Sequence, residues 1–300
     1  MIGSDFVTFL QLKYFVEVCN NGSFSLAAKV LFVTQPALSS AISNLEKEFS
    51  IKLFERKRYN LVLTKAGEFF YDRAKIVLDG VHIFESELRD ISKNQVTIRI
   101  GVPPMIGSFL FPKIYNRYLL DHVGAKFEMW EEGSLSIRNK ILNKTLDLGF
   151  SILNNSENEQ YNREVILDTE LVYCVSKSNK LADRNSLTIE DIKNEPIVLM
   201  REGSFQTRLI KNMFSKIDTE PDIVLVSSQI SVLRNFVKMD LGGAFLIKEL
   251  VDPNDESIVG IPFEDGLSLK IGLLWQKNTE LSNAAQEFIK HVKSMRYKFF

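Results

Sequence analysis

A run of apolar residues at alternating spacings of four and three, between residues 70 and 91, most constrains how this chain can fold. The spacing averages half a heptad and keeps these side chains on one side of a helix, as in a coiled coil. We therefore predict one long helix over residues 64–92 that pairs with a second copy of the chain. A helix packed on its own domain gives a similar pattern and is the alternative. The predicted dimerisation residues are Phe70, Ala74, Val77, Val81, Phe84, Leu88 and Ile91.

Length and composition place this helix inside a multidomain protein. The chain has 300 residues, of which 25% are charged and 45% hydrophobic, which is typical of globular proteins and argues against disorder. The net charge of −1 indicates no class of partner. Cys19 and Cys174 are too few and too far apart for a disulfide framework or a thiolate metal cluster. Without a signal peptide or a long apolar run, the sequence predicts a cytoplasmic protein with no membrane partner.

Three helices are expected before the long one. The first covers residues 9–20 and ends at Asn-Asn-Gly, and the second covers residues 24–31, with Ser23 as N-cap and Leu26, Ala27 and Val30 facing inward. The third runs to residue 49 from the N-cap Thr34, with a proline in its first turn. Two helices joined by a tight turn predict a helix-turn-helix.

The outer face of the third helix is polar but carries no charge before Glu46. Short hydroxyl and amide side chains suit close approach to base edges, and glutamine can pair with adenine. The pattern therefore favours a DNA-reading helix. An uncharged helix packed against another domain is the alternative. The side chains on this face are Thr34, Gln35, Ser39, Ser40, Ser43 and Asn44.

A basic β-ribbon follows over residues 53–63. Arg56, Lys57 and Arg58 lie near its predicted tip, where cations can bind the phosphate backbone without regard to base sequence. A solvated turn is the usual explanation for such a hairpin. Its position directly after an uncharged polar helix makes it a second indication of DNA binding.

The stretch LKYFVEVCNNGSFSLAAKVLFVTQPALSSAISNLEKEFSIKLFERKRYNLVLTKAG resembles the winged helix-turn-helix of LysR-type transcriptional regulators over nearly its whole length. The chain departs from the family pattern at Ser40 and Ser43, where basic residues are common, and at Ser50, where glycine is usual. The matching positions are Phe15, Gly22, Ser23, Ala27, Ala28, Leu31, Gln35, Pro36, Ala37, Leu38, Ser39, Ile42, Leu45, Glu46, Leu53, Phe54, Arg56, Leu63, Thr64, Ala66 and Gly67.

This resemblance implies a winged helix-turn-helix domain over residues 1–63 and a linker helix for dimerisation over residues 64–92. It implies double-stranded DNA as a partner, a homodimer that assembles further into a homotetramer, and RNA polymerase as a further candidate partner. The residues that it assigns to DNA binding are Ser23, Ser25, Thr34, Gln35, Pro36, Ser39, Ser40, Ser43, Arg56, Lys57 and Arg58.

The rest of the chain alternates strands with helices, which predicts βαβ units and a mostly parallel sheet. The number of units favours two α/β lobes with crossovers near residues 163 and 266. Lobe I would cover about 95–163 and 267–300, and lobe II about 164–266. By the resemblance, residues 95–300 form an effector-binding domain similar to periplasmic solute-binding proteins, with the last helix, from residue 281 to about 296, packed on lobe I.

Catalytic and metal-binding patterns are weak. His82, His122 and His291 have no second ligand at metal spacing, and GxSxG, P-loop and GxGxxG motifs do not occur. The sequence therefore predicts no enzyme, no cofactor and no metal. A solute-binding protein of the transport type is the alternative function, because the last two hundred residues alone would support it.

Three strand-to-helix turns of the expected lobes suit an effector. Ligands of open α/β sheets lie beyond the carboxyl ends of strands, and helix N-termini favour anions. Ordinary N-caps are the alternative explanation for the two serines. We predict a small organic anion, with Arg138 and Arg208 one turn further along. The predicted effector-binding residues, aligned with the family's effector-contact loops, are Pro104, Met105, Ser134, Ser204 and Phe205.

Overall fold

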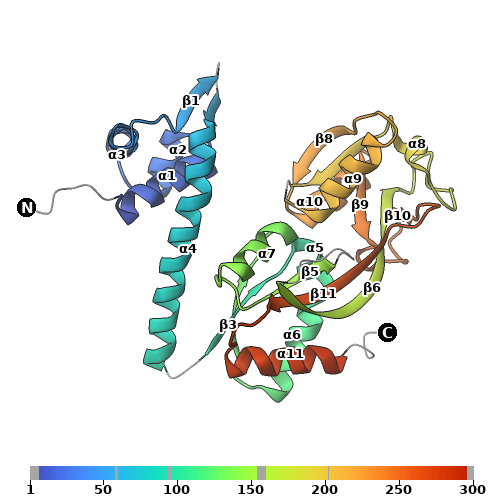
Figure 1. Ribbon diagram of the computed structural model, residues 1–300. Coiled ribbons are helices and arrows are strands. Elements are labelled where there is room, and N and C mark those ends of the chain that lie inside the picture. The colour runs from blue at the N-terminus through green and yellow to red at the C-terminus, as the bar shows by residue number, and fades with distance from the viewer. Residues whose placement is uncertain (1–6, 58–59, 94–95, 154–159, 202, 296–300) are drawn as a thin grey trace, which may run out of the picture. The chain divides into compact units, whose positions relative to one another are not determined.

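The computed structural model describes residues 7–57, 60–93, 96–153, 160–201 and 203–295 (Figure 1). The chain divides into two compact units, residues 1–93 and 94–300, which are described separately. In the described part, no single helix is long and apolar enough to cross a membrane, and only the bent pair of helices Phe24–Val30 and Gln35–Glu48 reaches that length and composition when taken together.

Unit 1 begins with the three predicted helices, whose bounds follow from their caps. Thr8 starts α1 (Phe9–Asn21) in a capping box with Gln11, and Gly22 ends it with φ at +60°. Ser23 caps α2 (Phe24–Val30), and Thr34 caps α3 (Gln35–Glu48). The ends of the helices in the helix-turn-helix are therefore determined by capping residues that can be recognised in the sequence.

The wing and the long helix complete unit 1. Strands β1 (Phe54–Lys57) and β2 (Asn60–Leu63) pair antiparallel, and α4 runs unbroken over Lys65–Lys93. Gly67 lies so close to the wing that a Cβ there would be 2.1 Å from the carbonyl oxygen of Leu53. The glycine therefore lets α4 begin directly against the wing.

The core of unit 1 centres on Phe15. Its ring lies 5.2 Å from that of Phe54 in the wing and 4.9 Å from that of Phe70 in α4, between ring centroids. Aromatic pairs at these distances contribute beyond the area that they bury. One side chain of α1 thus joins the wing to the long helix.

The expected inward face of α2 is partly wrong. Ala27 is buried, but Leu26 and Val30 are about half exposed, at 51% and 52%. The buried stripe instead contains Ala27 and Ala28, with Phe24 and Leu31 partly buried beside them. These positions follow the i, i+3, i+4, i+7 rule, so the predicted stripe was rotated around the helix.

Unit 2 is built on one mixed sheet of nine strands. Strand order is β4-β3-β5-β11-β6-β9-β7-β8, with β10 beside β6. Its elements are β3 Thr97–Gly101, α5 Pro104–Phe109, α6 Phe111–Asp121, β4 Lys126–Trp130, α7 Ser134–Leu142, β5 Leu148–Leu153, β6 Tyr161–Ser176, α8 Ile189–Ile192, β7 Pro196–Met200, α9 Phe205–Ser215, β8 Asp222–Ser227, α10 Ile230–Lys238, β9 Gly243–Ile247, the 3-10 helix η1 Lys248–Leu250, β10 Ile258–Ile261, β11 Ser268–Gln276 and α11 Asn283–Met295.

Two long strands connect the lobes of unit 2 (Figure 1). Residues 161–170 of β6 pair with β11, whereas residues 171–176 pair with β9 and β10. The first crossover, expected near 163, thus lies between Glu170 and Leu171, inside one strand, and the second lies beside Ser268. Every pair that β6 or β11 makes is antiparallel, so the expected mostly parallel sheet is mixed.

The last helix returns to lobe I. The ring of Phe288 on α11 lies 5.1 Å from Tyr118 of α6 and 5.1 Å from Phe127 of β4, between centroids. Phe288 and Val292 are fully buried there.

Two residues of unit 1 hold left-handed backbone without being glycine. Phe32 has φ of +56° and Ser50, where the LysR pattern has glycine, has φ of +52°. The left-handed conformation costs about 1–2 kcal/mol for a residue with a Cβ, and glycine costs about 0.5–1 kcal/mol through the unfolded chain.

We expect Phe32→Gly and Ser50→Gly each to stabilise unit 1 by about 0.5–1 kcal/mol, because the strain relieved exceeds the entropy lost. Urea unfolding of the full chain, with a probe in unit 1, measures the change. Ser50→Ala keeps a Cβ in the same conformation and serves as the control, for which no gain is expected. Midpoints that stay at the parental value in both glycine variants would contradict the strain argument.

Candidate functional site

The polar face of α3 points to solvent, as the sequence predicted. Leu38, Ile42 and Leu45 are buried on the inner side of the helix. On the other side, the side chains Thr34, Gln35, Pro36, Ser39, Ser40 and Asn44 are exposed, and Ser43 is partly buried. α3 therefore offers a continuous uncharged polar surface.

A hydrogen bond joins α2 to the start of this surface. The Ser25 hydroxyl donates to Gln35 Oε1 at 3.2 Å, and both side chains are exposed. This hydrogen bond holds the amide group of Gln35 and therefore favours one orientation of its side chain. Ser23 is used differently, because its hydroxyl accepts from the Leu26 N–H at 3.4 Å as the cap of α2.

Glu46 fixes the start of the wing, a role that the sequence analysis missed. Its Oε1 accepts from the Leu53 N–H at 2.8 Å, and Lys52 Nζ lies 2.7 Å from its Oε2. Burial would raise the pKa of this carboxyl, but Lys52 and the backbone N–H groups of Leu53 and Phe54 outweigh it and hold the pKa below its usual value. The carboxylate thus fastens the wing to the end of α3.

The basic residues of the wing lie on its first strand. Arg56 is paired with Leu61, and Lys57 with Asn60, where the ribbon turns. Arg58 lies outside the described residues. The ladder therefore places the backbone of Arg56 and Lys57 at the end of β1.

The predicted dimerisation residues of α4, which we call the heptad seam, fall into two groups. Phe70 and Ala74 pack in the core of unit 1 against α1, so these two are already covered within the chain. Val77, Phe84 and Leu88 are exposed, with Phe84 at 59%, and Val81 is partly buried. The side chain of Ile91 lies outside the described ones. Phe69 and Ile76, which were not predicted, are exposed as well.

The predicted effector residues in unit 2 have different surroundings. Pro104 is partly buried at the start of α5, and Met105 lies in the hydrophobic core. Ser204 caps α9: its hydroxyl accepts from the Thr207 N–H at 3.1 Å. Ser134 is buried and is the first residue of α7, so it starts a helix as predicted, and Gly133 holds the cap position that was the alternative explanation for Ser134.

The serine-bearing turns of the two lobes meet, as expected. A Cβ at Gly133 would lie 2.3 Å from the Gly203 carbonyl oxygen and 3.1 Å from the Ser204 nitrogen. Only glycine fits at position 133. The close approach leaves no room for a side chain at position 133, and it brings the starts of α7 and α9 together.

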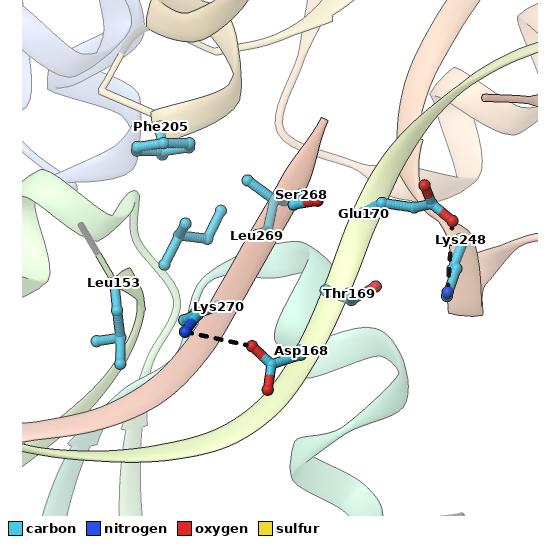
Figure 2. A pocket seen from close by; sticks show the side chains of 10 residues that line it. Leu153, Asp168, Thr169, Glu170, Phe205, Lys248, Ser268, Leu269 and Lys270 are labelled. Carbon is cyan, nitrogen blue, oxygen red and sulfur yellow. Dashed lines mark hydrogen bonds and ion pairs between the residues drawn. The ribbon is translucent and has the colours of Figure 1, made fainter. Parts of the chain in front are cut away.

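A cavity of about 710 Å³ lies where the lobes join (Figure 2). Phe205 is the one predicted effector residue among those that line it. Alternation along a strand carries no signal for such a cavity, so the sequence analysis missed the others. The lining residues are Ile152, Leu153, Asp168, Thr169, Glu170, Phe205, Lys248, Ser268, Leu269 and Lys270.

Charged side chains in this cavity are paired. Lys270 Nζ lies 3.8 Å from Asp168 Oδ1, directly across the β11–β6 ladder, and Lys248 Nζ lies 3.4 Å from Glu170 Oε1 (Figure 2). Both lysine side chains are half exposed, so each pair is weak and open to competition by a ligand.

Both cysteine thiols resist deprotonation, because each is at least partly buried. Burial raises the pKa of Cys19 to about 12 and that of Cys174 to about 12. Within the described residues, no group of three or more His, Cys, Asp or Glu side chains could hold a metal ion.

Comparison with known proteins decides the family. The model for bacterial regulatory helix-turn-helix proteins of the lysR family matches residues 9–68, and the LysR substrate binding domain matches residues 92–296. The chain belongs to the LysR family of transcriptional regulators. The helix-turn-helix match does not favour the transport-type solute-binding protein.

Relatives of this LysR regulator include an uncharacterised HTH-type regulator YwbI of Bacillus subtilis, 31% identical with 95% of each chain covered. The malolactic fermentation system transcriptional activator of Lactococcus lactis is 26% identical, covering 95% of this chain and 98% of the relative. Full-length CbnR in complex with its target DNA has the same fold, with a TM-score of 0.64 at 19% identity, covering 97% of this chain and all of that chain.

Proposed function

We propose that this LysR regulator reads its operator with the outer face of α3, holds the DNA backbone with the wing, dimerises through α4 and responds to a small organic anion bound between the lobes. The effector part of the proposal rests on the cavity beside β6 and β11, because residues of both lobes line this cavity. A further assembly into a tetramer and contact with RNA polymerase belong to the same proposal.

The DNA part rests on the division between polar and basic groups. Gln35 and Ser39 lie on the exposed, uncharged face of α3, which suits base edges. Arg56 and Lys57 lie on the first strand of the wing, and Arg58 follows them in the sequence. Cations at that place suit phosphates.

Gln35→Ala should lose about 1–3 kcal/mol of discrimination at particular base pairs, whereas Lys57→Ala should weaken all sequences alike and flatten the salt dependence. Operators selected from random duplexes supply the cognate DNA for fluorescence anisotropy. Ser25→Ala removes the partner of Gln35 and should reduce discrimination less than Gln35→Ala does. Equal losses on cognate and random DNA for Gln35→Ala would exclude it from base reading.

The dimer part rests on the exposed half of the seam. Val77, Phe84 and Leu88 follow the heptad spacing and are exposed, whereas Phe70 and Ala74 pack in the core of unit 1. Exposed apolar residues in heptad register are typical of a helix that meets a second helix.

Val77→Glu combined with Leu88→Glu should split the dimer, because each change places a charge against its symmetry mate in an apolar interface. Sedimentation velocity of the full chain measures the mass and, in the parent, shows whether dimers assemble into tetramers. Lys65→Glu changes an exposed position before the seam and should leave the mass unchanged. Parental mass and DNA affinity in the double variant would mean that this seam joins no chains.

The effector part rests on competition at the paired lysines. An organic anion in the cavity can displace Asp168 from Lys270, while Leu269 and Phe205 contact its apolar part. The N-terminus of α9, which Ser204 caps beside Phe205, further favours negative charge there. A ligand can bias the lobes only if it binds one arrangement more tightly than the other.

Lys270→Met should weaken binding of the anion by about tenfold to a hundredfold, since a hydrogen bond to a charged group contributes about 1.5–3 kcal/mol. A thermal-shift screen of small carboxylates finds the ligand, and calorimetry measures its affinity. Lys277→Met, an exposed lysine outside the cavity, is the control. Ser134→Ala and Ser204→Ala test the serines separately. A cationic or uncharged ligand, or full affinity in Lys270→Met, would contradict the assignment.

A further inference from the structure

Two of the three histidines of the chain meet where α11 packs on α6 (Figure 1). His122, at the end of α6, stacks on the ring of Tyr118 with 4.1 Å between the ring centroids. His291 on α11 meets the same ring nearly at a right angle, at 5.2 Å, and the two imidazole rings lie 6.4 Å apart. We call these three residues the histidine cluster.

The histidine cluster belongs to the contact that holds α11 on lobe I. Tyr118 is 1% exposed, and its hydroxyl donates to the Ala284 carbonyl in the first turn of α11 at 3.4 Å. Phe288, one turn before His291, is fully buried against the Tyr118 ring. A change that weakens the packing at His291 therefore loosens α11 from lobe I.

The imidazole of His291 is placed for its neutral form. Within the described residues, its Nε2 is buried and has no hydrogen-bond partner. A neutral imidazole can leave one ring nitrogen without a proton, whereas an imidazolium carries an N–H donor at both nitrogens. Protonation would therefore place a charged donor where no acceptor lies, which costs free energy.

The charged groups of α6 act on His291 in both directions. Asp121 favours the protonated ring, whereas His122 and Arg117 disfavour it. Burial is the largest effect and outweighs Asp121, so the pKa of His291 lies below its usual value of 6.5.

The carboxylate on the same helix already has a partner. Glu287 lies one turn before His291, and Lys290 Nζ lies 2.8 Å from its Oε1. Both side chains are exposed, so solvent screens their charges. Glu287 is therefore a weak source of compensation for a charge on His291.

The lowered pKa of His291 makes the docking of α11 depend on pH. When α11 leaves lobe I, the imidazole enters water and regains a pKa of about 6.5. Between the two pKa values, the undocked helix therefore binds more protons than the docked helix. Docking is at full strength above about pH 7 and weakens as the pH falls through the usual pKa of histidine.

We propose that the histidine cluster is an acid-sensitive switch that loosens α11 from lobe I. His291 is the titrating group, and His122 opposes a positive charge beside it. α11 follows β11, whose residues 268–270 line the cavity between the lobes, and Lys293 Nζ of α11 lies 5.7 Å from the centre of the Trp275 ring near the end of that strand. Loosening α11 removes this contact, so pH is an input to unit 2 that is separate from the proposed effector.

Hydrogen exchange of the full chain, followed by mass spectrometry of peptides from α11 and α9, tests the switch. After correction for the intrinsic pH dependence of exchange, protection of α11 should fall by about threefold or more from about pH 7.5 to about pH 5.5, and protection of α9 should change less. His291→Phe keeps an aromatic ring that does not titrate and should remove this extra loss.

Two further variants complete the test. His291→Gln keeps a polar side chain that does not titrate, so it should also remove the extra loss and answers the case in which phenylalanine disturbs the fold. His82→Gln changes the exposed third histidine, on α4, and should keep the parental pH dependence.

Three results would overturn the proposal. The same pH dependence in the parent and in both His291 variants would assign the loss to other groups. Loss of the pH dependence in His122→Phe but not in the His291 variants would place the titration on the other ring. An equal fall in protection of α9 and α11 would mean that acid unfolds unit 2 as a whole. These measurements involve neither DNA nor effector, so their failure would leave the proposed function standing.

Discussion

Strand β6 is the element on which unit 2 depends, because both lobes are built on it. Its partner changes from β11 to β9 between Glu170 and Leu171, so one continuous strand takes part in the hydrogen-bonding pattern of both lobes. A chain that crosses between lobes within a strand cannot separate them without breaking ladder bonds. Relative movement of the lobes must therefore occur by twisting at this point. Side-chain contacts continue beyond the β6–β9 ladder, since Lys248 Nζ lies 3.4 Å from Glu170 Oε1 and the Thr169 hydroxyl donates to Glu249 Oε2 at 2.5 Å. The cavity and its charged pairs lie at the place where such a twist would act.

In unit 1, the side chain of Phe15 joins α1 to the wing and to α4. Its ring contacts Phe54 of the wing and Phe70 of α4, while Ala74 is buried beside it. α3, the wing and the first turns of the long helix therefore form one packed body. The first heptad of α4, with Phe70 and Ala74, belongs to this core, so only the later residues of the heptad run remain for a second chain.

The elements that local chemistry determines were predictable, and those that depend on distant pairing were not. Ser23, Thr34 and Gly22 mark helix ends by capping, which acts within four residues, so the helix-turn-helix and the polar face of α3 followed from the sequence. The number of alternating strands and helices indicated two lobes, and the family resemblance indicated that they form an effector-binding domain. The cavity did not follow, because Asp168 and Lys270 become neighbours only through antiparallel pairing across a long sequence separation. Phe70 and Ala74 were assigned to the dimer because burial within a chain and burial between chains produce the same heptad spacing. The close contact of Gly133 with Gly203 was not predicted, because it joins turns on different lobes that are far apart in the sequence.

The balance of charge in the cavity limits how a ligand can act. Each lysine there already has a carboxylate partner, so a neutral apolar ligand would leave both pairs intact and contact mainly Phe205, Leu269 and Leu153. An anion would instead replace the carboxylate partner of a lysine, and that carboxylate would then be exposed to solvent. Lys248 lies directly after a strand of lobe II, whereas Lys270 lies on the part of β11 that pairs with lobe I strands. An anion that engages both lysines would hold the lobes at one angle, while one that engages Lys270 alone would only fill the cavity. The first kind of contact gives the differential affinity that a regulatory ligand needs.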